Sequence, residues 1–92
     1  MGICEVKAKK GLIRVTTEVE GGLIKDISIT GDFFMYPEES LWEIENSLKG
    51  IKADYDQIHK ILENVFNKLN VKLVGASVED FVSAVWCSIN GS

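Results

Sequence analysis

Long apolar runs are missing from this sequence, and none approaches the ~18 residues that a membrane-spanning helix requires. The first ten residues, MGICEVKAKK, also lack the uninterrupted apolar stretch of a secretory signal. We therefore expect a cytoplasmic protein that has no membrane partner.

Metal-binding side chains are scarce as well. The chain has two cysteines, Cys4 and Cys87, which lie near opposite ends, and one histidine, His59. Because zinc takes about four ligands and no CxxC spacing is present, no metal site is expected. Free cysteines are commonly buried as small apolar side chains, so two buried thiols are expected, with a disulfide as the alternative. His59 is expected to be a solvated helix residue.

Basic residues are outnumbered, with 10 lysines and arginines against 14 acidic residues and a net charge of -4. They form no stripe, and no aromatic residues are interleaved with them to stack bases, so nucleic acid is not expected as a partner. The hydrophobic share of 46% and charged share of 26% are typical of a folded globular chain. At this length, residues 1–92 are expected to form a single domain.

Alternation of apolar and polar residues in the first third predicts three antiparallel strands. Residues 4–9 alternate, the LIRVTTEV stretch alternates again after a KKG turn, and LIKDISIT follows a second turn at EGG. The residues expected to face inward are Cys4, Val6, Ala8, Ile13, Val15, Thr17, Val19, Leu23, Ile27 and Ile29.

Helical periodicity replaces this alternation in the second half. The first expected helix covers PEESLWEIENSLKG, with Pro37 in its first turn and Gly50 as its stop. Asp54 and Ser77 each begin a further helix, because each has a capping partner three residues later. The NVKLVG stretch between them is either a short edge strand or a connector. The expected fold is α+β, a three-stranded antiparallel meander followed by about three helices on one face.

The junction GDFF ends the third expected strand with Gly31 and Asp32 and then places Phe33 next to Phe34. Neighbours in an extended segment point to opposite sides, and a small sheet covered on one face buries one of them more easily than both. Two alternatives remain open. Either both phenylalanines are accommodated in the core, or one forms a contact surface for a partner or ligand.

Arg14 is expected to project from the sheet face that the helices leave uncovered. It is either solvated there or meets a carboxylate or phosphate across a subunit interface, where its planar guanidinium gives bidentate contact. No nucleophile with a neighbouring base and no Gly-rich phosphate loop is present, so no catalytic residue is predicted. The candidate partner-interface residues are Arg14, Gly31, Asp32, Phe33 and Phe34.

Residues 11–50, GLIRVTTEVEGGLIKDISITGDFFMYPEESLWEIENSLKG, closely resemble the C-terminal accessory domain of lipoate-protein ligases. The resemblance lies in the order of GLIRV, a Gly-containing turn, an I-x-GDFF segment and a helix that opens with Pro-Glu-Glu. Helices matching residues 54–69 and 77–89 also follow in that family. The family's large domain, with its substrate loop and lysine, is absent from these 92 residues. The chain therefore resembles the free-standing small subunit of a two-chain ligase.

This resemblance implies an accessory subunit, non-catalytic alone, that forms a heterodimer with a catalytic large subunit. It implies a need for the chain in the ATP-dependent activation of lipoate to lipoyl-adenylate. Lipoate, ATP and Mg²⁺ are then expected to bind the complex, and no cofactor is expected on this chain alone. The lipoyl-acceptor domains of 2-oxoacid dehydrogenases and the glycine cleavage H protein are implied as indirect partners. The alternative is a self-associating α+β module with its own small ligand.

Overall fold

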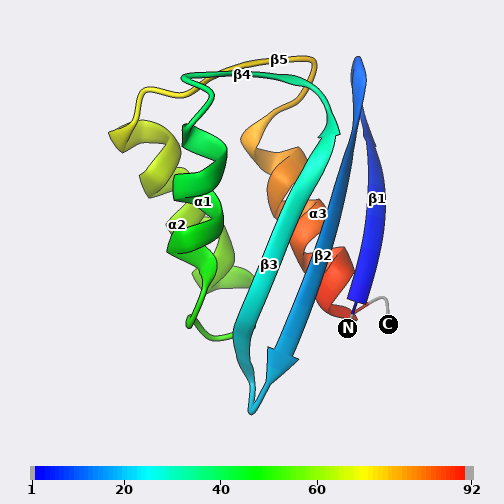
Figure 1. Ribbon diagram of the computed structural model, residues 1–92, viewed down its shortest axis with the longest axis vertical. Coiled ribbons are helices and arrows are strands. Elements are labelled where there is room, and N and C mark those ends of the chain that lie inside the picture. Colours follow the sequence, from blue (N-terminus) through cyan, green and yellow to red (C-terminus); the bar gives the residue numbers. More distant parts are fainter. Residues whose placement is uncertain (1, 91–92) are drawn as a thin grey trace.

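The computed structural model describes residues 2–90 and confirms the α+β architecture. Figure 1 shows a three-stranded antiparallel sheet, in the order β1-β2-β3, with three helices on one face and a second, two-stranded sheet across one end. The strands are β1 Gly2–Ala8, β2 Gly11–Glu20, β3 Leu23–Asp32, β4 Phe34–Tyr36 and β5 Lys72–Val74, and the helices are α1 Ser40–Leu48, α2 Tyr55–Lys68 and α3 Val78–Asn90. Among these helices, none combines the length and apolar character needed to cross a membrane.

The alternation predicted for β1 and for most of β2 is confirmed, but the prediction is wrong at the far end of the β2–β3 hairpin. Val19 and Leu23 are exposed, while Ile24 and Ile27 are both buried. The register between β2 and β3 shifts beside Val19 and leaves Lys25 without a paired residue. Such a bulge places two consecutive residues, Lys25 and Asp26, on the outer face. The buried residues on its two sides, Ile24 and Ile27, are therefore three positions apart instead of two.

The capping signals place the second and third helices correctly. Asp54 precedes α2, and its carboxylate accepts a hydrogen bond from the Gln57 amide at 3.3 Å. Ser77 and Asp80 form a reciprocal capping box before α3, with bonds of 2.9 and 3.3 Å. Both caps give a hydrogen-bond acceptor to an amide at the start of the helix that has no intrahelical acceptor.

The first helix begins later than predicted, at Ser40 instead of at Pro37. Residues 34–36 form β4, which pairs with β5, so the chain is still extended when it reaches the proline. A residue before proline favours this extended conformation. The Ser40 amide then donates to the Pro37 carbonyl at 3.0 Å, which turns the chain into α1. The NVKLVG stretch thus supplies a strand, β5.

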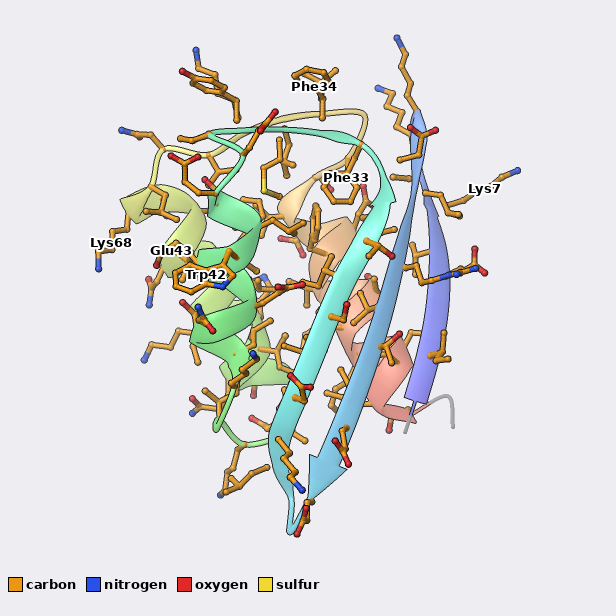
Figure 2. The ribbon with its side chains drawn as sticks, viewed as in Figure 1. Lys7, Phe33, Phe34, Trp42, Glu43 and Lys68 are labelled. Carbon is orange, nitrogen blue, oxygen red and sulfur yellow. A yellow bond between two sulfur atoms is a disulfide. The ribbon has the colours of Figure 1, made fainter. Side chains whose placement is uncertain are left out.

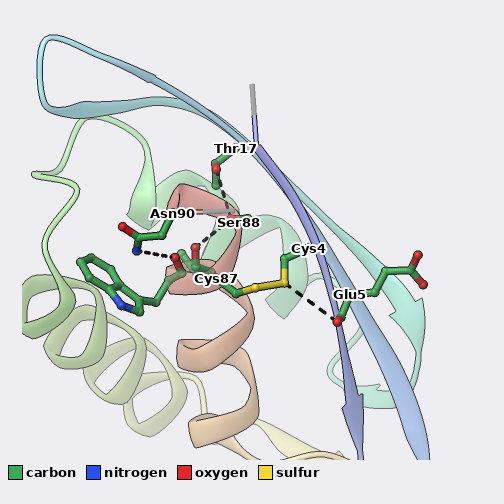
Figure 3. The surroundings of a disulfide bond; sticks show 8 residues. Cys4, Glu5, Thr17, Cys87, Ser88 and Asn90 are labelled. Atoms are coloured by element: carbon green, nitrogen blue, oxygen red, sulfur yellow. Dashed lines mark hydrogen bonds between the residues drawn. A yellow bond between two sulfur atoms is a disulfide. The ribbon is translucent and has the colours of Figure 1, made fainter. Parts of the chain in front are cut away.

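The core lies between the inner face of the sheet and the helices, and it includes one buried polar pair. Thr17 of β2 and Ser88 of α3 are both buried, and their hydroxyl oxygens lie 3.1 Å apart (Figure 3). The buried apolar residues are Ile13, Val15, Ile24, Ile27, Ile29, Met35, Ile44, Leu48, Ile58, Leu62, Phe66, Phe81, Val82, Ala84 and Val85.

The two edges of the main sheet differ. On the β3 edge, the Ile29 amide donates to the Glu45 carboxylate of α1 at 2.8 Å. Further along the same edge, the Ile24 amide donates to the Ile51 carbonyl at 2.9 Å, and the Ile24 carbonyl accepts from the Gly50 amide at 2.7 Å. Within residues 2–90, β1 is paired only on the side that faces β2.

Cys4 and Cys87 form a disulfide, so the expectation of two buried thiols is wrong (Figure 3). Cys4 lies on the face of β1 that α3 covers (Figure 3), and the two Cα atoms are 5.8 Å apart. This separation lies within the range that a disulfide spans. The bridge joins residues 83 positions apart and ties the edge strand β1 to the last turns of α3.

Candidate functional site

The GDFF junction lies where β3 ends and β4 begins, and it separates the two phenylalanines. Phe33 turns inward and packs edge-on against Phe81 of α3, with ring centroids 5.1 Å apart and an interplanar angle of 82°. Phe34 points away from the body of the protein, with 72% of its surface exposed (Figure 2). The alternative in which both phenylalanines are buried in the core is therefore wrong.

The pairing of β4 with β5 gathers exposed apolar side chains around Phe34. Phe34 pairs with Val74 and Tyr36 pairs with Lys72, while Met35 between them faces the core. Since paired residues share a face and neighbours alternate, these four side chains form one surface, here called the β4–β5 outer face. Tyr36 and Val74 are each 65% exposed.

An open groove of about 380 Å³ lies beside Phe34, between the end of β3 and the start of α1. Gly31 contributes to this groove, and a Cβ atom at this position would overlap the carbonyl oxygen of Leu12 on β2. Only glycine therefore permits this approach of the two strands. The groove is lined by Ile29, Thr30, Gly31, Phe33, Phe34, Met35, Glu38 and Leu41.

Lysines flank the β4–β5 outer face on its other side. A second groove, of about 440 Å³, is lined by Lys9 and Lys10 of the β1–β2 turn together with Val74. The Lys10 amide donates to the Gly75 carbonyl at 3.1 Å, which fixes this turn against the end of β5. Together with Lys72, these lysines border the apolar surface, and the carboxylates of Glu38 and Asp80 lie in the linings of the first and the second groove.

Arg14 lies apart from this surface. Its guanidinium contacts the Glu5 carboxylate at 2.9 Å, and the two residues are cross-strand partners on the uncovered face of the sheet. Both side chains are about half exposed, and such pairs typically contribute at most ~1 kcal/mol. The structure thus brings four of the five candidates together, namely Gly31, Asp32, Phe33 and Phe34, and leaves Arg14 elsewhere.

Sequence reasoning missed Tyr36, Lys72 and Val74. The spacing of Phe34 and Tyr36 at a period of two is a signal for a strand, but the pairing with β5 depends on the fold. It also missed the surroundings of His59. This side chain lies on α2 and is one-third exposed, and it stands between the carboxylates of Glu63 and Glu79, which the sequence did not predict.

Comparisons with known proteins agree with the fold. Residues 4–85 match the family described as bacterial lipoate protein ligase C-terminus. The chain is 46% identical over 79 residues to lipoate-protein ligase A subunit 2 of Thermoplasma acidophilum, covering 86% of this chain and 81% of that protein.

A solved structure is also similar. It is described as a bi-partite lipoate protein ligase and its E2 lipoyl domain from Thermoplasma acidophilum. One of its chains matches with a TM-score of 0.83 and 43% identity, over 90% of this chain and 91% of that one. The chain therefore belongs to the family of lipoate-protein ligase C-terminal domains, and its similarity is to the separate small subunit of a two-chain ligase.

Proposed function

We propose that this chain is the small subunit of a two-chain lipoate-protein ligase. In this role it docks on a catalytic large subunit and is needed for the ATP-dependent activation of lipoate to lipoyl-adenylate. The observation that carries the proposal is the β4–β5 outer face, an exposed apolar surface on a chain whose relative is one part of a bi-partite ligase. The assembled enzyme then transfers lipoate to a lysine of an acceptor such as an E2 lipoyl domain.

The β4–β5 outer face has the character of a docking surface. Phe34 and Tyr36 are exposed aromatic side chains on a strand that is anchored by the buried Met35. Rigid aromatic anchors dominate the energetics of many protein interfaces. Lys9, Lys10 and Lys72 favour a partner surface that is apolar at its centre and carries acidic groups opposite these lysines, because complementary charge speeds association. We assign this partner to the large subunit.

ATP, lipoate and Mg²⁺ are assigned to the large subunit as substrates and metal of the complex. The groove beside Phe34 is lined mainly by apolar side chains, and the charged side chain in its lining is the carboxylate of Glu38. A carboxylate repels a triphosphate, and the lining of this groove contains no glycine-rich loop to cradle one. This supports a subunit that acts on its partner, without a nucleotide site of its own.

The proposed action is a shift in the large subunit's conformational equilibrium. In the activation step, a carboxylate oxygen of lipoate attacks the α-phosphorus of ATP and pyrophosphate leaves. Charge develops on the leaving group, so this step depends on ordered substrate loops around the phosphates. A small subunit that binds the competent conformation more tightly raises its population. In the transfer step, a lysine amine attacks the carbonyl of lipoyl-adenylate and AMP leaves, so no pyrophosphate has to be accommodated.

The test is a pair of assays of the large subunit with and without this chain. With lipoate and ATP, we expect product only when both chains are present. With synthetic lipoyl-adenylate, we expect the large subunit alone to retain most of its transfer activity. Equal activity from lipoate and ATP in the absence of this chain would overturn the proposal.

The alternative function is that of a self-associating module. Light scattering distinguishes it from the proposed function, because it measures the molar mass of the purified chain. An isologous dimer through the β4–β5 outer face would bring Lys72 of each copy onto the same apolar surface, where like charges oppose association. We expect a monomer that gains mass only when the large subunit is added. A tight homodimer that excludes the large subunit would favour the self-associating module.

A further inference from the structure

His59 lies between two carboxylates on the side of the molecule that α2 and α3 form. Its Nδ1 atom is 2.9 Å from Glu63, one turn further along α2, and its Nε2 atom is 3.3 Å from Glu79, in the first turn of α3. Ligand atoms of these three residues all lie within 4.8 Å of one another. Neither carboxylate pairs with a lysine or arginine among residues 2–90.

Aromatic packing fixes the orientation of the imidazole. Tyr55, one turn earlier on α2, stacks on His59 with ring centroids 6.1 Å apart and an interplanar angle of 14°. Tyr55 in turn packs edge-on against Trp86 of α3, at 5.7 Å and 83°. The ring is therefore held in the contact between the two helices, with Nε2 turned towards Glu79.

A neutral imidazole in this position has an unbalanced set of contacts. It carries one N–H group, and its second nitrogen is an acceptor. When Glu63 accepts the Nδ1 hydrogen, the Nε2 lone pair faces the carboxylate of Glu79, which is also an acceptor. A cation between Nε2 and that carboxylate satisfies both. A carboxylate that holds one imidazole nitrogen while the other binds a metal is a recurrent arrangement in metalloproteins.

We propose that His59 and Glu79 bind one zinc ion, with Glu63 orienting the imidazole through Nδ1. Zinc binds imidazole nitrogen and carboxylate oxygen at about 2.0 to 2.2 Å, and two such ligands at a tetrahedral angle lie roughly 3.3 to 3.4 Å apart. The observed separation of 3.3 Å between Nε2 and the Glu79 oxygen matches this spacing. Water completes the coordination, since Glu79 is exposed at the surface. The ion links α2 to α3, and the proposal does not depend on the proposed ligase function.

Calorimetric titration of the oxidised chain with zinc chloride tests this site. We expect one ion per chain with submillimolar affinity, and a loss of at least tenfold in affinity in each of the variants His59→Gln and Glu79→Gln. Glu63→Gln should lower the affinity for zinc by a smaller factor, because the amide oxygen of glutamine still accepts the Nδ1 hydrogen. Glu43→Gln, which removes an exposed carboxylate from α1, is the matched control and should bind as the unmodified chain does. Circular dichroism verifies that each variant is folded.

Nuclear magnetic resonance identifies the coordinating nitrogen directly, because His59 is the only histidine in the chain. On addition of zinc, we expect the Nε2 resonance to shift while Nδ1 stays protonated. Three results would overturn the proposal: the same zinc affinity in His59→Gln as in the unmodified chain, coordination through Nδ1, or no zinc-dependent change at millimolar concentration.

Discussion

Thr17 and Ser88 join β2 to α3 through a hydrogen bond of 3.1 Å between two buried hydroxyl groups. Ser88 donates its own hydrogen to the Val85 carbonyl at 2.7 Å, so the hydrogen shared with Thr17 comes from the threonine. The direction of this bond makes the two partners unequal. Removing the acceptor leaves a buried donor without a partner, whereas removing the donor leaves Ser88 still bonded to Val85.

We therefore expect Ser88→Ala to be more destabilising than Thr17→Val. An unsatisfied buried hydroxyl costs about 1 to 3 kcal/mol, whereas loss of one hydrogen bond costs about 1 kcal/mol. Urea unfolding of the two variants measures the difference. The double variant should be more stable than the sum of the single losses predicts, because it contains no unsatisfied group. Equal losses with strict additivity would show that the two hydroxyl groups are not energetically coupled and would contradict this assignment.

Phe33 and Phe34 should respond differently to truncation. Phe33→Ala removes the contact with Phe81 and should lower the free energy of unfolding by about 3 kcal/mol. Phe34→Ala should leave the melting temperature nearly unchanged and weaken binding of the large subunit at least about tenfold, or ~1.4 kcal/mol. Trp42→Ala is the control, because Trp42 is 64% exposed and lies on α1 (Figure 2). A larger effect on binding from Trp42→Ala would move the interface away from β4 and β5.

Reduction of the Cys4–Cys87 disulfide should destabilise the chain strongly. The bridge closes a long loop, with 83 positions between its ends, and so restricts the unfolded chain. Loss of such a bridge costs about 2 to 5 kcal/mol, which corresponds to roughly 10 to 30 °C in melting temperature at this size. Calorimetry with and without a reductant measures the change. The variant with serine at both positions should have a melting temperature close to that of the reduced chain, and the reductant should not change it.

Gly31 should tolerate alanine less well than Gly21 does. Both have a positive φ, of 155° and 61°, so a side chain strains the backbone at either position. At Gly21 the space around a Cβ atom is open, whereas at Gly31 it is filled by the Leu12 carbonyl. We expect a loss of about 1 kcal/mol for Gly21→Ala and more than ~2 kcal/mol for Gly31→Ala in urea unfolding. Equal losses of stability would mean that β2 and β3 can separate at Gly31 without cost and make room for the side chain.

The parts of the fold that the sequence predicts are those that depend on neighbouring residues. Period-two alternation identified the three long strands, and the capping residues Asp54 and Ser77 placed α2 and α3. The bulge at Lys25 escaped prediction because it interrupts the alternation on which the prediction relies. The disulfide and the pairing of Phe34 with Val74 join positions far apart in the sequence, so the packed fold alone reveals them.

The candidate site divides in the same way. Two adjacent phenylalanines after a strand leave open whether both enter the core or one faces outward, and the outcome depends on the ring of Phe81, against which Phe33 packs. The remainder of the outer face comes from β5, which is too short for its sequence to identify. His59 and Glu63 are one helical turn apart in the sequence, and Glu79 joins them only because α3 packs against α2.

The unequal edges of the main sheet limit how copies of this chain can assemble. A filament built by strand pairing requires two available edges on every copy, so that each chain receives one neighbour and offers an edge to the next. Here Glu45 and the segment around Ile51 occupy backbone groups along β3, and β1 is the edge that remains. Within residues 2–90, two copies can therefore pair β1 with β1, and such a pair leaves no free β1 edge in the main sheet for a third chain. Growth by strand pairing through the main sheet therefore stops at two chains, because its other edge, β3, is partly occupied by the protein's own polar groups.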